Sequence, residues 1–281
     1  MTETILTRET MTAYQEHLES EEKAPATVAK YMRDVAAFHR FLPTDKEVTR
    51  EAVLSYKQIL EQRYKAASAN SMLTALNSFL SFLKREDCRV RLLKVQRRCF
   101  RDSDRELTRQ EYERLVRAAK RQKNERISLL IQALCSTGIR VSEHRFLTVE
   151  ALQTGRARIV NKGRERTIFL PNELRGILLQ YCKRKGIISG PVFVTRTGRP
   201  MNRCNIWSEM KSLCRVAGVD SRKVFPHNLR HLFAVTYYRL EKDIVRLADL
   251  LGHSSVDTTR IYTATCGDEC VRTLSRMKLL C

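Results

Sequence analysis

The sequence has no apolar run long enough to cross a membrane. Its longest run, near Ile127–Cys135, falls far short of the ~20 residues that a spanning helix needs. The N-terminus shows no stretch that resembles a secretory signal, and no internal repeat or low-complexity tract is evident. These absences exclude an integral membrane protein and favour a folded intracellular chain, in keeping with a hydrophobic content of 43%.

The cysteines provide no disulfide framework. Their number, nine, is odd, and the chain is too long to depend on disulfides for its core. Cys266 and Cys270 are the closest pair, but no second pair or nearby histidine completes a zinc site. We therefore expect thiols in a reducing cytoplasm, most of them buried, and no bound metal.

Acidic residues are scarce beside basic ones. The 31 Asp and Glu residues stand against 52 Lys and Arg, which gives a net charge of +21 and a pI near 9.9. Such an excess attracts nucleic acid, because neutralised phosphates release their condensed counterions. An anionic membrane surface is the alternative partner, but the basic residues are spread along the chain rather than gathered in a tail. The expected partner is therefore double-stranded DNA and not a membrane.

The length of 281 residues predicts two domains. Residues 1–87 are predicted to be a helical DNA-binding domain, because apolar residues such as Val28, Tyr31 and Val35 recur at helical spacing. Packing alone explains these apolar faces, so contacts with DNA must come from the basic outer faces. The helices are expected at about 8–21, 25–42, 49–63 and 68–85. The candidate DNA contacts are Lys30, Arg33, Arg63 and Lys65.

Between residues 88 and 105 the helical period fails and basic residues accumulate, among them Arg97 and Arg98. This segment is predicted to be a basic linker that runs along a DNA backbone, although a solvated connector fits the composition equally well. Thr108 and Glu111 then have the spacing of a capping box. They predict the first helix of a second domain over residues 106–281.

The second domain is predicted to be mainly helical with a small β-sheet. Two β-like runs, Arg156–Val160 and Glu165–Leu170, predict a hairpin, and Pro191–Val194 predicts a third strand. Gly252 stands where the end of a helix needs a residue with positive φ. The fold class is therefore mainly α, with a helical DNA-binding domain joined to an α+β catalytic domain. The helices of the second domain are expected at about 122–137, 142–150, 172–185, 203–216, 228–239, 242–251 and 255–264.

Arg140 and Arg230 are candidates for binding a phosphate, because a guanidinium donates two parallel hydrogen bonds and keeps its charge. His227 precedes Arg230 by three residues, so both side chains lie on one helical face. An imidazole there donates to the phosphate or assists proton transfer, and His253 is a second candidate donor. Each residue alone is better explained as a surface charge or an ordinary turn residue. The ordered set favours phosphate chemistry.

Tyr262 is the candidate nucleophile. A phenol has a pKa of about 10, so it needs cationic surroundings to attack at neutral pH. In isolation this tyrosine would be assigned to core packing. Lys162 is the candidate acid for a leaving 5′-oxygen, although Arg164 and Arg166 are close enough in sequence to be alternatives. Arg164 is also a candidate DNA contact. Glu143 is placed to orient Arg140 or a histidine, or else is a solvent-facing carboxylate.

Four segments resemble, in order and approximate spacing, the motifs of the tyrosine-type site-specific recombinases, the phage integrase and Xer family. They are Thr137–Glu143, His227–Ala234, Leu251–Ser254 and Thr259–Tyr262. The first half of the chain is similar to the core-binding domain of the family through its helix pattern and through Thr27, Tyr31 and Phe38.

The resemblance implies that Tyr262 attacks the scissile phosphate, forms a 3′-phosphotyrosyl bond and releases a 5′-hydroxyl. The ester keeps the energy of the broken bond, so no cofactor, neither ATP nor metal, is implied. The resemblance also implies a two-domain clamp on DNA and a homotetramer that exchanges strands through a Holliday junction. Residues from about Cys266 to Cys281 would contact a neighbouring protomer. The outcome would be integration and excision, inversion or dimer resolution.

The chain departs from the family pattern at two places. The turn after Lys162 is one residue shorter, and His144-Arg145 replaces residues that are often apolar. No arm-binding N-terminal domain is expected, which favours a simple recombinase that acts on short core sites. An accessory DNA-bending or directionality factor is a further candidate partner. A type IB topoisomerase and a non-catalytic DNA-binding regulator are the alternatives, and the expected location is the cytoplasm, in association with the nucleoid.

Overall fold

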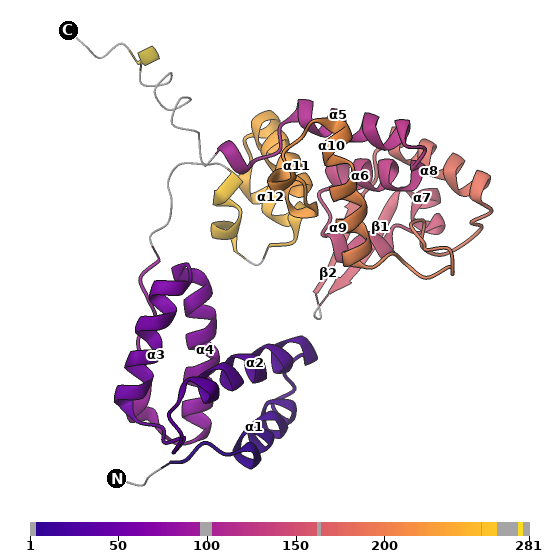
Figure 1. Ribbon diagram of the computed structural model, residues 1–281. Helices are drawn as coiled ribbons and strands as arrows, with labels where there is room; N and C mark the ends of the chain where they lie inside the picture. The colour runs from indigo at the N-terminus through magenta and orange to yellow at the C-terminus, as the bar shows by residue number, and fades with distance from the viewer. Residues whose placement is uncertain (1–3, 96–102, 162–163, 254, 263–274, 278–281) are drawn as a thin grey trace. The chain divides into compact units, whose positions relative to one another are not determined.

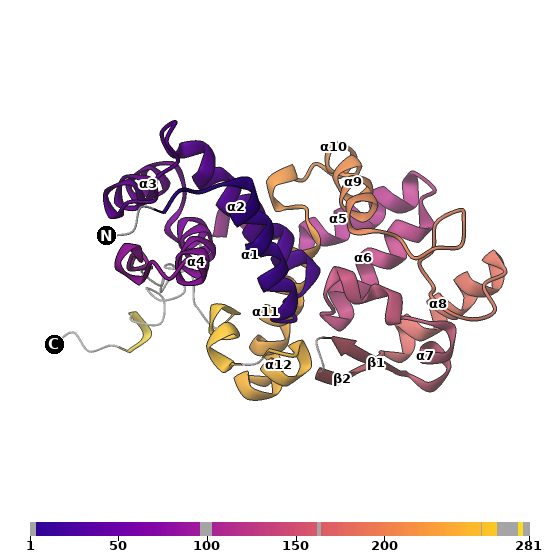
Figure 2. The same ribbon diagram turned by 90° about the horizontal axis from the view of Figure 1, so that it is seen from below.

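The computed structural model describes residues 4–95, 103–161, 164–253, 255–262 and 275–277. The chain divides into two compact units, residues 1–97 and 98–281 (Figures 1 and 2). In the described residues no helix combines the length and apolar character that a membrane span needs. The mainly helical fold class predicted from the sequence is confirmed.

The first unit is built from four helices, close to the predicted ranges. Thr7 and Thr49 cap α1 and α3 through their hydroxyls, while Pro25 begins α2, where a missing N–H costs nothing. The core is centred on Tyr14, Phe38 and Phe79, which are fully buried. The helices are α1 (Arg8–Ser20), α2 (Pro25–Phe41), α3 (Arg50–Arg63) and α4 (Ala66–Phe82).

The start of the expected basic linker packs against this first unit. Cys88, the last residue of a short 3-10 turn, η1 (Glu86–Cys88), is buried in its core, as is Val90. Two amides of α4 hold the backbone that follows. Asn77 exchanges two hydrogen bonds with Val90, and Asn70 exchanges two with Leu93, at 2.7–3.0 Å. Residues 88–93 are therefore fixed to the helices and do not form a solvated connector, because Cys88 and Val90 are buried and the two amides bond the backbone of Val90 and Leu93.

The second unit surrounds a central helix, α6, which packs against α5, α8 and α11. The predicted capping box is present at the start of α5, where Thr108 and Glu111 exchange hydrogen bonds. Figures 1 and 2 both show α12 beside α11 and next to the strand β2 (Arg164–Phe169). The helices are α5 (Arg109–Arg121), α6 (Glu125–Thr137), α7 (Val149–Thr154), α8 (Asn172–Lys185), α9 (Arg203–Ser212), α10 (Cys214–Ala217), α11 (Pro226–Glu241) and α12 (Ile244–Leu251).

The predicted hairpin is confirmed as antiparallel strands β1 (Arg156–Asn161) and β2 (Arg164–Phe169). Its side chains alternate, as strand geometry requires. Ala157, Ile159 and Ile168 are buried, whereas Arg158 on the opposite face forms an exposed ion pair with Glu165.

The expected third strand at Pro191–Val194 is wrong. In the described part of the chain this segment makes only isolated bridges, from Pro191 to Thr148 and from Val194 to Pro200. Proline has no N–H to donate to a sheet. In this segment the N–H of Val192 donates to the carbonyl of Leu147, which precedes the hairpin in the sequence.

Two helices expected near the candidate site are 3-10 turns instead. The 142–150 prediction is replaced by η3 (Val141–Phe146) followed by α7, and the 255–264 prediction by η5 (Val256–Thr258) and η6 (Arg260–Tyr262). In η3 the carboxylate of Glu143 accepts from the backbone of Arg140, and His144 is buried with its Nδ1 2.5 Å from the carbonyl of Val141. The expected 203–216 helix is interrupted at Leu213, between α9 and α10. These are tertiary effects that helical periodicity does not reveal.

Candidate active site

Arg140 lies directly after the end of α6. Gly138 ends that helix with φ +64°, and a side chain there would meet the ring of Phe233. Arg140 Nη1 donates to Glu143 Oε1 at 3.0 Å, and Nη2 donates to the carbonyl of Gly252 at 3.1 Å. Its side chain is 38% exposed, whereas Glu143 is only 2% exposed. Arg140 therefore exposes part of its charge to solvent while hydrogen bonds to Glu143 and Gly252 hold its guanidinium in place.

Arg230, on the first turns of α11, is 3% exposed. Its guanidinium donates to the carbonyl of Gly138 at 2.6 Å and to that of Leu251 at 2.7 Å, so it links the ends of α6 and α12. Burial, and then the charge of Arg140, lower the pKa of Arg230 to about 10. The group remains cationic at neutral pH, and an anion placed beside the two arginines would relieve their mutual repulsion.

His253 follows α12, whose last turn closes at Gly252 with the predicted positive φ of 63°. Its Nε2 lies 3.0 Å from Arg230 Nη2, and its Nδ1 lies 2.8 Å from the hydroxyl of Thr259. Burial, followed by the charges of Arg230, Arg140 and Arg166, lowers the pKa of His253 to about 4. The imidazole is therefore neutral at physiological pH in this state.

His227 and Arg230 both lie on α11, one helical turn apart, as the sequence predicts. The His227 side chain reaches the surface of the unit. Partial desolvation, then the charges of Arg230, His231 and Arg140, lower the pKa of His227. His231, one helical turn after His227, lies 3.0 Å from a carboxylate oxygen of Glu106.

Tyr262 is almost fully buried, at 2% exposure, in a small core formed with residues of α11 and α12. Its ring stacks on that of His253, with the centroids 6.1 Å apart and the planes 14° from parallel. The ring of His231 lies 5.1 Å away at a steeper angle. The structure therefore brings Tyr262, His253, Arg230 and Arg140 into one continuous cluster.

Arg166 also belongs to this cluster. The sequence predicts it only as an alternative to Lys162 as the acid for the leaving oxygen. From β2 its side chain donates to Glu143 Oε2 at 2.6 Å and to the carbonyl of Leu251. It is 13% exposed, and it passes so close to Gly252 that any side chain at that position would meet it. An inward position in β2 opposite the buried Ile159 is the sequence signal that could have identified it.

Several predicted site residues lie outside the described residues. They are Lys162, Arg97 and Arg98, together with the side chain of Arg164 and most of the 266–281 segment. Among the candidate DNA contacts, Arg33, Arg63 and Lys65 are exposed. Lys30 is not a freely presented cation, because its ammonium donates to Asp34 at 2.6 Å and to the carbonyl of Ser71 at 3.0 Å. It ties α2 to α4.

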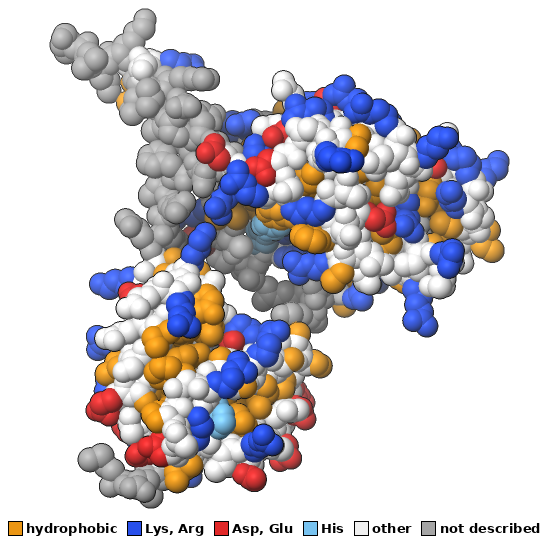
Figure 3. Space-filling view, in the orientation of Figure 1, with side chains coloured by type: hydrophobic (Ala, Val, Ile, Leu, Met, Phe, Trp, Pro, Cys, Tyr) orange, Lys and Arg blue, Asp and Glu red, His pale blue; other side chains and the backbone are white. Residues whose placement is uncertain are grey.

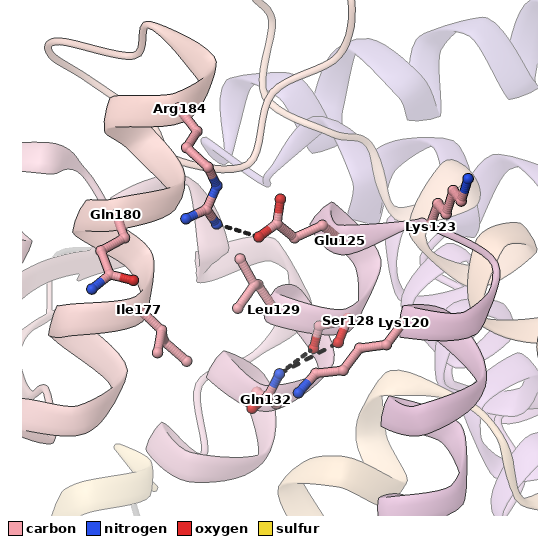
Figure 4. A pocket seen from close by; sticks show the side chains of 9 residues that line it. All are labelled: Lys120, Lys123, Glu125, Ser128, Leu129, Gln132, Ile177, Gln180 and Arg184. Atoms are coloured by element: carbon pink, nitrogen blue, oxygen red, sulfur yellow. Dashed lines mark hydrogen bonds and ion pairs between the residues drawn. The ribbon is translucent and has the colours of Figure 1, made fainter.

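The described residues contain no group of three or more His, Cys, Asp or Glu side chains that could hold a metal ion. A surface pocket of about 390 Å³ lies elsewhere, between α6 and α8 (Figure 4). Four of its polar side chains are engaged with one another: Arg184 pairs with Glu125, and Gln132 donates to Ser128. Its lining includes neither a histidine nor a tyrosine, so it adds nothing to the candidate chemistry.

The cluster combines groups suited to displacement at phosphorus. The cluster contains three guanidiniums, those of Arg140, Arg166 and Arg230, and one buried carboxylate, that of Glu143. It therefore carries an excess of positive charge. Guanidinium and imidazole donors can neutralise the oxygens of a phosphate, and a nearby phenol can attack its phosphorus.

Comparison with known proteins places the chain among recombinases. The Phage integrase family matches residues 105–267, and the Phage integrase, N-terminal SAM-like domain matches residues 11–87. Tyrosine recombinase XerD of Proteus mirabilis is 33% identical over 264 residues, which cover 84% of this chain and 82% of that protein. Tyrosine recombinase XerA of Pyrococcus furiosus is 28% identical over 100% of this chain and 98% of that protein.

Among solved structures, a lambda integrase dimer bound to a COC′ core site is similar in fold. The TM-score is 0.73, with 18% identity over 93% of this chain and 77% of that one. The ordered motifs, the two units and the sequence matches lead to one conclusion: this chain belongs to the phage integrase family.

Proposed function

We propose that this protein is a site-specific DNA recombinase that cuts and rejoins strands through a phosphotyrosyl intermediate. The observation that carries the proposal is the convergence of two guanidiniums on the histidine that stacks against Tyr262. Arg230 contacts His253 directly, and Arg140 donates to the carbonyl that precedes it. The net charge of +21 supports double-stranded DNA as the substrate. Figure 3 shows Lys and Arg side chains spread over the visible face of the 98–281 unit, with few acidic ones among them.

In the proposed reaction, Tyr262 Oη forms a bond to the scissile phosphorus and the bond from phosphorus to the 5′-oxygen breaks. Arg140 and Arg230 neutralise the non-bridging oxygens, and His253 donates a further hydrogen bond to them. His227 accepts the phenolic proton, and Lys162 gives a proton to the departing 5′-oxygen. A 5′-hydroxyl from the partner duplex then reverses the step. The number of phosphoester bonds is unchanged, so no ATP is consumed.

The burial of Tyr262 adds a requirement to this reaction. At 2% exposure the ring cannot reach a DNA phosphate from its present position. The η6 turn that carries it must therefore move when DNA binds, while Arg140, which is 38% exposed, already faces solvent. Cleavage would be limited by that rearrangement as well as by the chemistry.

The proposed assembly is a homotetramer on two paired DNA sites, with a Holliday junction as the intermediate. A lambda integrase tetramer bound to a Holliday junction is among the structures of similar fold. The 266–281 segment is the proposed protomer contact, an accessory DNA-bending factor is a further candidate partner, and association with the nucleoid would follow from DNA binding. The relatives found are recombinases, and no observation favours a topoisomerase or a regulator.

The test is to recover DNA that stays attached to the protein after denaturation and to sequence it. Wild type should yield adducts at a defined site, and Tyr262→Phe should yield none while binding the same DNA with unchanged affinity. Tyr64→Phe, at an exposed tyrosine of the first unit, is the matched control and should behave as wild type. Equal adduct yields from wild type and Tyr262→Phe would refute the assignment of the nucleophile.

A further inference from the structure

Thr259 is a fully buried polar residue, at 0% exposure, that contacts both His253 and Tyr262. Its hydroxyl lies 2.8 Å from His253 Nδ1. Its carbonyl accepts the backbone N–H of Tyr262 at 2.9 Å, and its own N–H donates to Val256 at 2.8 Å. One residue thus contacts the candidate phosphate donor with its side chain and the candidate nucleophile with its backbone.

The contacts of His253 define its tautomer in this state. A guanidinium can only donate, so the Nε2 atom that faces Arg230 at 3.0 Å must be the acceptor. The proton of the neutral ring is then on Nδ1, and the Thr259 hydroxyl accepts it. In this tautomer the Nε2 atom has no proton to offer to a phosphate.

Donation to a phosphate oxygen requires a proton on Nε2. A hydroxyl can act as donor or acceptor after a simple rotation. Thr259 can therefore accept from Nδ1 when the ring is an imidazolium, and it can donate to Nδ1 when the neutral ring carries its proton on Nε2. A side chain that could only donate, or only accept, would leave Nδ1 without a hydrogen bond in one of these two states of the ring.

We propose that Thr259 is a positioning residue that holds the ring of His253 in place and sets its tautomer as Arg230 turns from the imidazole to the phosphate. The inference rests on the proposed function for the role of His253. It goes beyond that function because it assigns a task to a fully buried threonine that has no part in the proposed reaction. The backbone bond from Tyr262 to Thr259 couples the placement of the ring to the η6 turn.

A role in packing alone is the competing explanation, and matched variants separate the two. Thr259→Val keeps the shape and loses the hydroxyl, while Thr259→Ser keeps the hydroxyl and loses a methyl group. Thr258→Val makes the same chemical change at the adjacent, exposed threonine. If Thr259 serves packing alone, Thr259→Ser should be the more damaging change. If its hydroxyl positions His253, Thr259→Val should be the more damaging change.

The first measurement needs no DNA. Long-range ¹⁵N–¹H correlations of the full chain should show His253 with its proton on Nδ1 in wild type, Thr259→Ser and Thr258→Val. In Thr259→Val the ring should keep this tautomer, because Arg230 still donates to Nε2, but the Nδ1 proton loses its acceptor. Its NMR signal should therefore shift and exchange faster with solvent. A Nδ1–H signal in Thr259→Val with the wild-type shift and exchange rate would overturn the proposal, whether or not the protein proves to be a recombinase.

The second measurement is single-turnover cleavage of a nicked duplex that carries the site recovered from wild-type adducts. Thr259→Val should cleave about tenfold more slowly or worse, since misplacing a proton-transfer group forfeits part of its contribution. Duplex affinity should be unchanged, and Thr259→Ser should restore the rate. A wild-type rate for Thr259→Val, or an equal loss for Thr259→Ser, would overturn the proposal. A failure of wild type to cleave would count against the proposed function, and the measurement on the Nδ1 proton of His253 would still decide the role of Thr259.

Discussion

Arg166 on strand β2 donates to the carboxylate of Glu143 at 2.6 Å, and Glu143 in turn accepts from Arg140. The hairpin is thereby connected to the turn that carries the exposed arginine of the site. Glu143 is 2% exposed, so its charge is tolerated because two guanidiniums and the backbone N–H of Arg140 surround it. The geometry supports the interpretation of Glu143 as an orienting residue.

Replacing Arg166 should destabilise the second unit. Arg166→Met removes a hydrogen bond to a buried carboxylate, which typically costs about 1.5–3 kcal/mol of the free energy of unfolding. Arg158→Met, on the same hairpin, removes an ion pair to Glu165 from a side chain that is 76% exposed, and should cost about 0–1 kcal/mol. Urea unfolding followed by the fluorescence of Trp207, the single tryptophan, would measure both. Equal losses of the free energy of unfolding would show that the buried ion pair stabilises the protein no more than the exposed one.

Gly252→Ala should be more harmful than the same change at another helix end. Gly252 has φ +63°, and an added Cβ would collide with the side chain of Arg166. Gly186, at the end of α8, has φ +66° but has no neighbouring atom within 4 Å, so Gly186→Ala measures the backbone cost alone, about 1–2 kcal/mol. We expect Gly252→Ala to exceed that value and Arg166→Ala to relieve part of the excess. Additive losses in the double variant would exclude the predicted collision.

Stability should fall as the pH is lowered from 6.5 towards 4. The folded-state pKa of His253 is about 4 against an ordinary 6.5, so in this window the unfolded chain binds a proton that the folded chain does not. The contribution of His253 is complete above pH 6.5, is lost as the pH falls, and should amount to about 1–3 kcal/mol. His144 and His227, whose pKa values are also lowered, act in the same direction. Urea unfolding at several pH values should give a shallower dependence for His253→Gln, and parallel curves would contradict the assignment.

Arg230→Lys should lose cleavage although it keeps a positive charge. The guanidinium bonds two carbonyls and His253 from one planar group, and an ammonium at the end of a flexible chain cannot reproduce that fork. We expect single-turnover cleavage to fall about 100-fold or more, with little change in duplex affinity. Arg246→Lys, on an exposed face of α12, is the control and should cleave at the wild-type rate. A small loss in Arg230→Lys would mean that charge alone suffices.

Much of the fold could be predicted because its signals are local. The apolar spacing of the first unit gave the four helices to within a few residues, and Thr108 with Glu111 located the start of α5. The residues around Tyr262 could not be predicted in the same way. A helix is expected there, at about 255–264, but the chain forms two 3-10 turns, η5 and η6. The bonds that accompany these turns, such as His253 to Thr259, join side chains whose meeting depends on α12.

The sequence by itself determined most of the helices, the hairpin, the basic character of the chain and the identity and order of its motif residues. These follow from residue spacing, capping and charge, which are properties of short stretches of chain. Only the tertiary structure decided that Arg166 pairs with Glu143, that Thr259 faces His253 and that Tyr262 is buried. Such contacts join residues of different elements, and their distances are set by how α11, α12 and β2 pack. Sequence spacing carries no measure of those distances.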